Sequence, residues 1–164
     1  MSQLLCAGLS WGTGRTQSIS NPHPFLQSLV ALTKDDSTER LTSYLNQATI
    51  EDLSRVSKLT ENWDHAGSLA PNPAAVANAF ARLPEICSMA IKKSQWTSPH
   101  VGASESGEIT FEWWNRDKKL TLYFGLTGVE AIKVWGPDID EEMTHFSLEQ
   151  VDELAPSWAW LYGE

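Results

Sequence analysis

The hydrophobic period of the chain changes once, near Pro99, and this change most constrains the fold. Within residues 25–93, apolar residues recur every three or four positions, as on one face of a helix. Over residues 97–136 they alternate, in four stretches separated by the short segments ESG, NRDK and LTG. Because connections this short join only antiparallel neighbours, we expect an antiparallel meander of four to five strands. The order of elements predicts an α+β fold, with N-terminal helices packed on one face of the sheet.

The length of 164 residues is sufficient for a single domain with one core. Residues 1–24 are rich in Gly, Ser and Thr without sustained periodicity, and we expect an irregular or partly disordered arm. Residues 25–164 are predicted to form one α+β domain. Its parts are a helical half at 25–93, the antiparallel sheet at 97–136, and an acidic loop, a short helix and an aromatic tail at 137–164.

Three helices are expected before the sheet. The segment DDSTERLTSYLNQ has Ser37 as its N-cap, and TIEDLSRVSKL opens on Thr49 with the spacing of a capping box. The third helix begins at Pro73 after the capping residue Asn72, since a proline at the first position loses no hydrogen bond. We expect Pro84 to kink this helix. Its predicted buried face comprises Val76, Phe80, Leu83, Cys87 and Ile91.

The C-terminal segment combines a helix signal with several aromatic residues. In FSLEQVDEL, Ser147 and Gln150 have the spacing of a capping box and predict a short helix. In APSWAWLYGE, Trp158, Trp160 and Tyr162 either alternate as a last strand or pack on the sheet as an aromatic clamp. The sequence leaves these two alternatives open.

The net charge of −9 argues against nucleic-acid phosphates or an anionic membrane as direct ligands. No apolar run reaches the roughly 18 residues of a membrane span, and the N-terminus lacks the basic region of a signal peptide. Cys6 and Cys87 are too few and too distant in sequence to indicate a disulfide scaffold or a zinc site. We expect a cytoplasmic protein without a cofactor or a metal.

The last part of the chain is strongly acidic. From Val134 to Glu164 there are eight acidic residues and no basic one. Such a stretch is either a solvated surface that keeps the protein soluble or a surface complementary to a basic partner. An exposed tryptophan beside it would make a strong contact for a protein partner. The residues that we expect at such a partner surface are Trp114, Asp138, Asp140, Glu141, Glu142, Trp158 and Trp160.

Two consecutive tryptophans separate the two faces of the predicted sheet. Because successive residues of a strand point to opposite sides, Trp113 is expected with Ile109 and Phe111, and Trp114 with Glu112 on the other face. One of the two tryptophans belongs to the core. The other is either covered by another segment or exposed.

The segment LTENWDHAGSLAPNPAAV joins the second and third expected helices. Asp64 and His65 suggest a base and its orienting partner, which together with Glu112 would serve a small hydrolase or transferase. Adjacent residues point in different directions, however, and a catalytic pair usually meets through the fold. We therefore favour a corner in which Gly67 adopts positive φ, Asp64 accepts backbone N–H groups and Trp63 anchors the loop.

The motifs NWDHAG and SGEITFEWW, with a proline-initiated helix between them, resemble a family of small bacterial and mobile-element proteins of mostly unassigned function. Its pattern is an Asn-Trp-Asp-Gly-Tyr-Gly-Ala turn and an Asp-Gly-x-Ile-x-Leu-Glu-Trp strand. The matching residues are Asn62, Trp63, Asp64, Gly67, Gly107, Ile109, Glu112 and Trp113, whereas His65, Ala66, Ser68 and Ser106 depart from the pattern. The resemblance covers residues 59–135. It implies an interaction role, such as antitoxin or inhibitor, and supplies no active site.

The sequence thus favours a non-enzymatic acidic binding protein that inhibits or neutralises another macromolecule. An antitoxin-like or phage-encoded inhibitor would fit, with a partner whose basic surface belongs to a nucleic-acid-handling complex. Two alternatives stay open. One is the hydrolase or transferase that uses Asp64, His65 and Glu112, and the other is a structural subunit that self-assembles, for example as a homodimer, through its aromatic tail.

Overall fold

The computed structural model describes residue 44 and residues 46–93, 96–138 and 140–163, which fall within one unit of the fold, residues 35–164. The predicted arm at 1–24, Cys6 and almost all of the helix expected after Ser37 lie outside the described residues. The described elements are a helical segment at 46–56, α2 (Pro73–Lys92), β1 (His100–Ala103), β2 (Ile109–Asn115), β3 (Lys118–Phe124), β4 (Val129–Val134), β5 (Met143–Leu148), the 3-10 helix η1 (Val151–Leu154) and α3 (Ala155–Tyr162).

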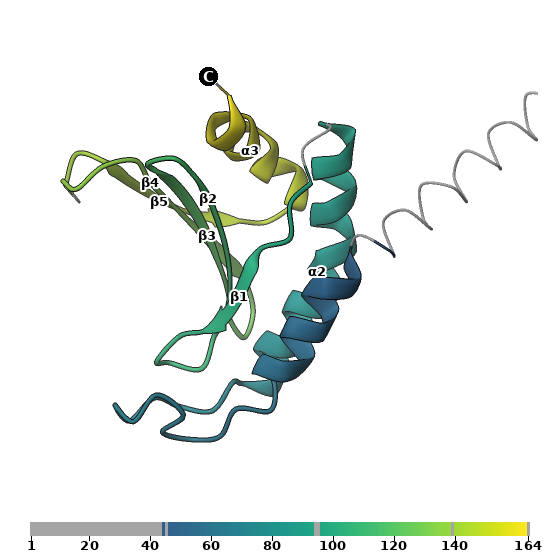
Figure 1. Cartoon of the computed structure of the whole chain (residues 1–164), viewed down its shortest axis with the longest axis vertical. Coiled ribbons are helices and arrows are strands. Elements are labelled where there is room, and N and C mark those ends of the chain that lie inside the picture. The colour runs from purple at the N-terminus through teal and green to yellow at the C-terminus, as the bar shows by residue number, and fades with distance from the viewer. Residues whose placement is uncertain (1–43, 45, 94–95, 139, 164) are drawn as a thin grey trace, which may run out of the picture. The chain divides into compact units, whose positions relative to one another are not determined.

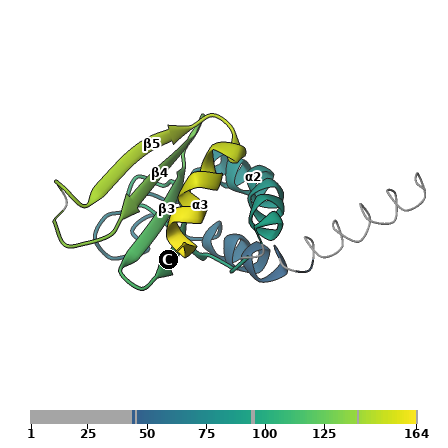
Figure 2. The same cartoon turned by 90° about the horizontal axis from the view of Figure 1, so that it is seen from above.

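The predicted α+β class is confirmed, with a five-stranded antiparallel sheet and a short C-terminal helix. The strand order is β1-β2-β3-β4-β5, and each strand pairs with its neighbour in sequence. Short turns impose this meander, because they leave no length for a crossover. Helices α2 and α3 both contact β2 and β3, and they lie on the same side of the sheet (Figures 1 and 2).

The core lies between these helices and one face of the sheet. Ile109, Phe111 and Trp113 of β2 are fully or almost fully buried, and so are Leu120, Leu122 and Phe124 of β3. The intervening residue Trp114 is 51% exposed. The predicted division of β2 into two faces is therefore confirmed, and Trp113 is the core member of the tryptophan pair.

The buried face of α2 differs from the predicted one. Asn72 caps the helix through its side-chain oxygen, as expected, and α2 continues without interruption through Pro84. Phe80, predicted to be in the core, is 36% exposed, and Val76 is only partly buried. The buried residues are Ala75, Ala79, Leu83, Ile86, Cys87, Met89 and Ala90. The small alanines allow a close approach of the helix to its neighbours, and this leaves the large Phe80 at the rim.

Two further boundaries differ from the sequence prediction. Thr49 does not cap a helix but lies inside the helical segment at 46–56, where it is buried on one side with Leu53 and Val56. Ser147 does not cap a helix either, because it belongs to β5 and pairs with Glu130 of β4. In both places, packing against the rest of the fold outweighs the local capping signal.

The aromatic tail forms helix α3 and not a last strand. It packs on the sheet, as the clamp alternative requires. The Trp158 ring lies 5.1 Å from the Trp113 ring and 6.5 Å from the Trp96 ring, measured between centroids. Lys118 holds the end of the helix by donating to the carbonyl oxygens of Trp160 (2.8 Å) and Gly163 (3.1 Å). A cation at a helix C-terminus is favourable because the terminal carbonyls lack partners within the helix.

Candidate functional site

The sheet has a second face, opposite to α2 and α3, which we call the open face. No helix in the described part of the chain covers it (Figures 1 and 2). Its side chains alternate with those of the core along each strand. They include His100, Thr110, Glu112, Trp114, Lys119, Thr121, Tyr123, Glu130, Ile132, Met143, His145 and Ser147. A sheet face of this size is a candidate interaction surface.

Glu112 is the centre of a polar cluster on the open face. One carboxylate oxygen, Oε1, lies 2.5 Å from Lys119 Nζ and accepts a hydrogen bond from Thr121 Oγ1 at 3.4 Å. The other, Oε2, lies 3.7 Å from His100 Nδ1. The sheet register brings them together, because His100 and Thr121 are the cross-strand neighbours of Glu112 on either side. The Glu112 side chain is 18% exposed and is largely enclosed by these three side chains.

Trp114 lies beside this cluster and stays accessible. Lys119 Nζ lies 5.3 Å from the centroid of its ring, and the His100 ring approaches it edge-on at 5.9 Å. A lysine over the face of an indole ring is attracted by the electrons of the ring. These neighbours fix the orientation of Trp114 while half of its surface remains in water. The residue is therefore a preoriented, exposed aromatic side chain.

A shallow hollow of about 420 Å³ lies at one end of the open face. Leu59 and Trp63 line it from the loop after the first described helix, and His100, Thr110, Glu112 and Tyr123 line it from the sheet. The Trp63 Nε1 group donates a hydrogen bond to the Leu69 carbonyl oxygen at 3.3 Å. The Trp63 side chain is half-buried, which agrees with its predicted role as an anchor of the loop. Its ring also adds an aromatic side chain to the hollow at the end of the open face.

Residues 62–68 form the corner that the sequence predicts. Asp64 Oδ1 accepts the Ala66 N–H at 2.9 Å, and Asp64 Oδ2 accepts the Ser68 hydroxyl at 2.6 Å. Asn62 Oδ1 accepts the Gly67 N–H at 2.9 Å, and Gly67 has a φ of 94°. The hydrogen bond from the Ser68 hydroxyl, followed by that from the Ala66 N–H, lowers the pKa of Asp64 below its ordinary value. Asp64 therefore stabilises the turn as a carboxylate.

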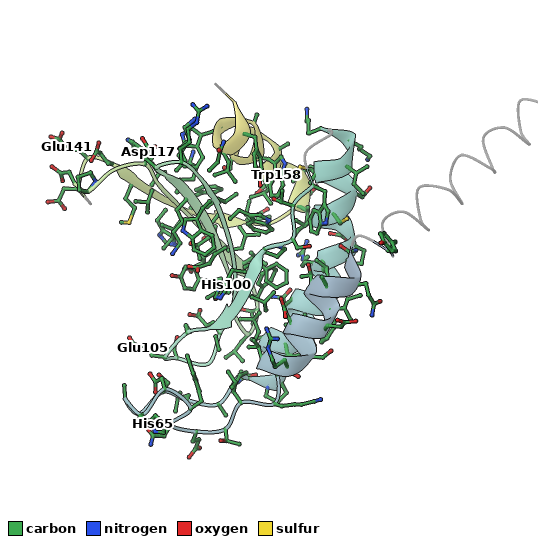
Figure 3. The ribbon with its side chains drawn as sticks, in the orientation of Figure 1. His65, His100, Glu105, Asp117, Glu141 and Trp158 are labelled. Atoms are coloured by element: carbon green, nitrogen blue, oxygen red, sulfur yellow. The ribbon has the colours of Figure 1, made fainter. Side chains whose placement is uncertain are left out.

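The structure does not assemble the predicted trio of Asp64, His65 and Glu112. The contacts of Asp64 stay within the corner, and the polar contacts of Glu112 are with Lys119, Thr121 and His100. His65 lies on the corner loop, apart from His100 on β1 (Figure 3). The histidine that lies near Glu112 is His100, which sequence reasoning did not select.

Asp64→Asn is expected to lower the melting temperature at neutral pH, because the variant loses the charged acceptor of the Ser68 and Ala66 hydrogen bonds. The folded-state pKa of Asp64 is lowered, so this stabilisation is present above the unfolded pKa and is lost as the pH falls through the folded pKa. The difference in melting temperature between wild type and variant should therefore shrink in acid, which thermal circular dichroism would record. Glu61→Gln, an equal loss of charge at an exposed neighbour, serves as the control. Equal melting temperatures for Asp64→Asn and wild type at neutral pH would contradict the role in the corner.

The segment after the corner docks on the β1–β2 turn. Leu69 donates its N–H to the Glu105 carbonyl oxygen at 2.9 Å, and Asn72 donates to the Gly107 carbonyl oxygen at 2.8 Å. Gly107 has a φ of 83°, and a Cβ at this position would lie 2.6 Å from the Ala70 carbonyl oxygen. The two motifs NWDHAG and SGEITFEWW are thus joined by backbone hydrogen bonds that sequence reasoning missed. Gly107 in the second motif is the sequence signal from which this close approach of two backbone segments could have been predicted.

The β4–β5 turn holds the acidic residues 138 and 140–142, which we call the acidic hairpin. Glu142 organises it, since its Oε2 accepts the Asp138 N–H at 2.9 Å and its own N–H donates to the Asp138 carbonyl oxygen. Asp138 Oδ1 accepts the Asp140 N–H at 3.1 Å. Asp140 and Glu141 are exposed, and Glu141 marks an end of the sheet remote from His65 (Figure 3). Of the four carboxylates, Glu142 is thus the one that mainly maintains the turn.

The two C-terminal tryptophans predicted at the partner surface lie elsewhere. Trp158 belongs to α3 and is fully buried against the sheet, so it is a core residue and the expectation of a surface contact is wrong for it. Trp160 is half-buried on the helix side of the sheet, with Lys118 Nζ and Lys133 Nζ at 5.6 and 5.4 Å from its ring centroid. Both rings contact side chains on the helix side of the sheet, Trp158 with Trp113 and Trp160 with the two lysines. Trp114 is therefore the candidate aromatic contact.

A second hollow, of about 650 Å³, lies between the start of α2 and the β3–β4 turn. Asn78 Nδ2 donates there to the carbonyl oxygens of Gly125 (3.3 Å) and Gly128 (3.0 Å). Glu108 Oε2 accepts hydrogen bonds from the hydroxyls of Ser104 (3.2 Å) and Ser106 (3.0 Å). The Asn78 bonds dock the β3–β4 turn on α2, whereas the Glu108 bonds stay within the β1–β2 turn.

The described residues hold neither a metal-binding cluster nor a membrane-spanning helix. No three side chains of His, Cys, Asp or Glu come close enough there to hold a metal ion together. None of the helices that the structure describes is long and apolar enough to cross a membrane. The chain matches no protein-family model, no curated protein and no solved structure.

Proposed function

We propose that this protein is a non-enzymatic binding protein for a partner protein with a basic surface. The observation that supports it most is Trp114, which is 51% exposed on a sheet face without a helical cover among the described residues. A large aromatic side chain that is already oriented by its neighbours binds with little loss of conformational entropy. Trp63 and Tyr123 border the adjoining hollow and extend the same surface.

The acidic hairpin gives this surface its preference for basic partners. Asp138, Asp140 and Glu141 are exposed on a turn that continues β4 and β5 of the same sheet. With a net charge of −9 over the whole chain, such a turn attracts a cationic surface over several ångströms. The charges mainly accelerate association, whereas the burial of aromatic surface slows dissociation.

A basic groove that handles nucleic acid is the partner surface that best complements this charge. The protein would inhibit such a partner by occupying the groove in place of the phosphates. This inhibitory role rests on the charge of the acidic hairpin and on the net charge of the chain. It also agrees with the antitoxin-like or inhibitory role that the resemblance of the two motifs implies.

The tagged protein should retain a stoichiometric partner from a bacterial lysate at low salt and release it at high salt, with mass spectrometry naming the partner. Asp140→Lys combined with Glu141→Lys is then expected to slow association on the order of tenfold and to flatten its salt dependence. These two residues are chosen because Glu142 maintains the turn.

The matched control combines Glu51→Lys with Glu61→Lys, which changes the net charge equally on exposed residues outside the hairpin. Association rates measured by surface plasmon resonance should differ between the two double variants. Equal rates for both would show that the hairpin has no specific role. The absence of any retained partner would contradict the proposed function itself.

A further inference from the structure

The outer edge of β5 is the most accessible backbone edge of the described sheet. β5 and β1 are the two edge strands. β1 has four residues, and Leu59 and Trp63 lie beside it in the hollow at that end. β5 has six residues, four of which are exposed, and among the described elements its main contacts are with β4 and η1. The edge of β5 can therefore be reached by another extended chain.

The backbone groups that point outward from β5 follow from the pairing of β4 with β5. In an antiparallel pair, residues that exchange hydrogen bonds alternate with residues whose N–H and C=O groups point away. Trp135 donates to Glu142 at the turn, so the alternation assigns Thr144, Phe146 and Leu148 to the bonds with β4. The outward groups then belong to Met143, His145 and Ser147. Among the described residues, no backbone hydrogen bond from a turn or loop reaches these outward groups.

This edge lacks the features that usually prevent strand addition. Protected edge strands carry lysine, proline or a bulge. The sequence MTHFSL contains neither lysine nor proline, and its register with β4 continues without a bulge from Met143 to Leu148. A sixth strand could therefore form a regular ladder with Met143, His145 and Ser147.

Acidic residues lie at both ends of the edge. Asp138, Asp140 and Glu141 precede β5, and Glu149, Asp152 and Glu153 follow it. Arg82 donates to the Glu149 carbonyl oxygen, but it is also paired with Glu85 at 3.7 Å. A second copy of this chain, added antiparallel, would bring acidic residues opposite acidic residues. A segment with basic residues at both ends is complementary in charge instead.

We propose that an extended segment of the basic partner adds to β5 as a sixth strand, with lysine or arginine residues at both of its ends. This inference deepens the proposed function and rests on it. Alternate side chains of the added strand would lie beside Met143 and His145 on the open face, and the others beside Phe146 on the helix face. The backbone ladder would supply affinity, and the terminal charges would supply the selection of basic segments.

The direct test uses the wild-type protein and the capped probe peptide Lys-Arg-Val-Thr-Val-Thr-Val-Arg-Lys. In nitrogen-15 NMR spectra, the peptide is expected to shift the amide signals of Met143, His145 and Ser147 and to slow their hydrogen exchange. Replacing its four basic residues with glutamate should weaken binding at least about tenfold. Only alternate N–H groups of an added strand face β5, so methylating the valine nitrogens and methylating the threonine nitrogens should have unequal effects. Unmoved β5 amide signals, or equal binding of both methylated peptides, would overturn the proposal.

A second test separates strand addition from the proposed function. Ser147→Pro removes an outward N–H while the ladder with β4 keeps the bonds of Phe146 and Leu148, and Ser147→Ala is its control. The partner retained from the lysate should be lost with Ser147→Pro and kept with Ser147→Ala. Retention by Ser147→Pro, together with loss by Trp114→Ala, would leave the binding function standing and refute strand addition. If Ser147→Pro does not fold, the comparison of binding by the two methylated peptides serves as the test of strand addition.

Discussion

Trp158→Ala is expected to lower the free energy of unfolding by about 3–5 kcal/mol. The side chain is fully buried and contacts the rings of Trp113, Trp96 and Tyr162, whose centroids lie 5.1, 6.5 and 5.3 Å away. Alanine would leave a cavity where α3 meets the sheet, and the surrounding rings can close it only in part. Urea denaturation followed by circular dichroism measures the change.

Trp114→Ala is the matched control, because it also replaces a tryptophan with alanine, but on the side of the sheet opposite to α3. Its expected cost is below about 1 kcal/mol, since an exposed ring contributes little beyond its contact with the Lys119 ammonium. A similar loss for both variants would contradict the assignment of Trp158 to the core and Trp114 to the surface.

Gly107→Ala is expected to destabilise the protein by about 1–3 kcal/mol. Gly107 has a φ of 83°, a conformation that side chains with a Cβ rarely adopt. The added methyl group would also lie 2.6 Å from the Ala70 carbonyl oxygen, so the docked segment must move. Thermal and urea unfolding should both show the loss.

Gly128→Ala provides the comparison. Gly128 lies in the β3–β4 turn without a positive φ, and no atom lies within 4 Å of a Cβ placed there. We expect a change within about 0.5 kcal/mol of wild type. If Gly107→Ala were as mild as Gly128→Ala, the docking of the corner on the β1–β2 turn would not contribute to stability.

The sheet could be predicted from the sequence because its signals are local. Alternation in EITFEWW and KLTLYFG assigns each residue to a face, and the short turns between strands fix their antiparallel order. The burial of Ile109, Phe111 and Trp113 follows this assignment. The corner was also predictable, since Asp64 and Gly67 have turn chemistry that depends on nearby residues alone.

The errors arise where distant packing outweighs local signals. The capping patterns at Thr49 and Ser147 are real in the sequence, but burial against the core and pairing with β4 decide their conformation. The orientation of α2 depends on how closely Ala75 and Ala79 allow it to approach other elements, and hydrophobic spacing alone favoured Phe80 instead. The burial of Trp158 likewise depends on how α3 packs against the sheet, so its assignment to the core required the structure.

The candidate site depends on sheet register, which spacing in the sequence does not determine. His100, Glu112 and Thr121 become neighbours only when β1, β2 and β3 pair in one particular alignment. A shift of one residue would exchange the faces and bury Glu112 in place of Trp113. The sequence predicted Trp114 and the acidic residues of the hairpin for one partner surface, but their positions on the sheet required the structure.

The most direct test of the binding function compares wild type and Trp114→Ala with the partner that the protein retains. Surface plasmon resonance would measure the dissociation rates, and circular dichroism the melting temperatures. We predict that the variant dissociates at least about tenfold faster while its melting temperature changes little. Equal dissociation rates for a folded Trp114→Ala variant would contradict the assignment of the open face as the binding surface.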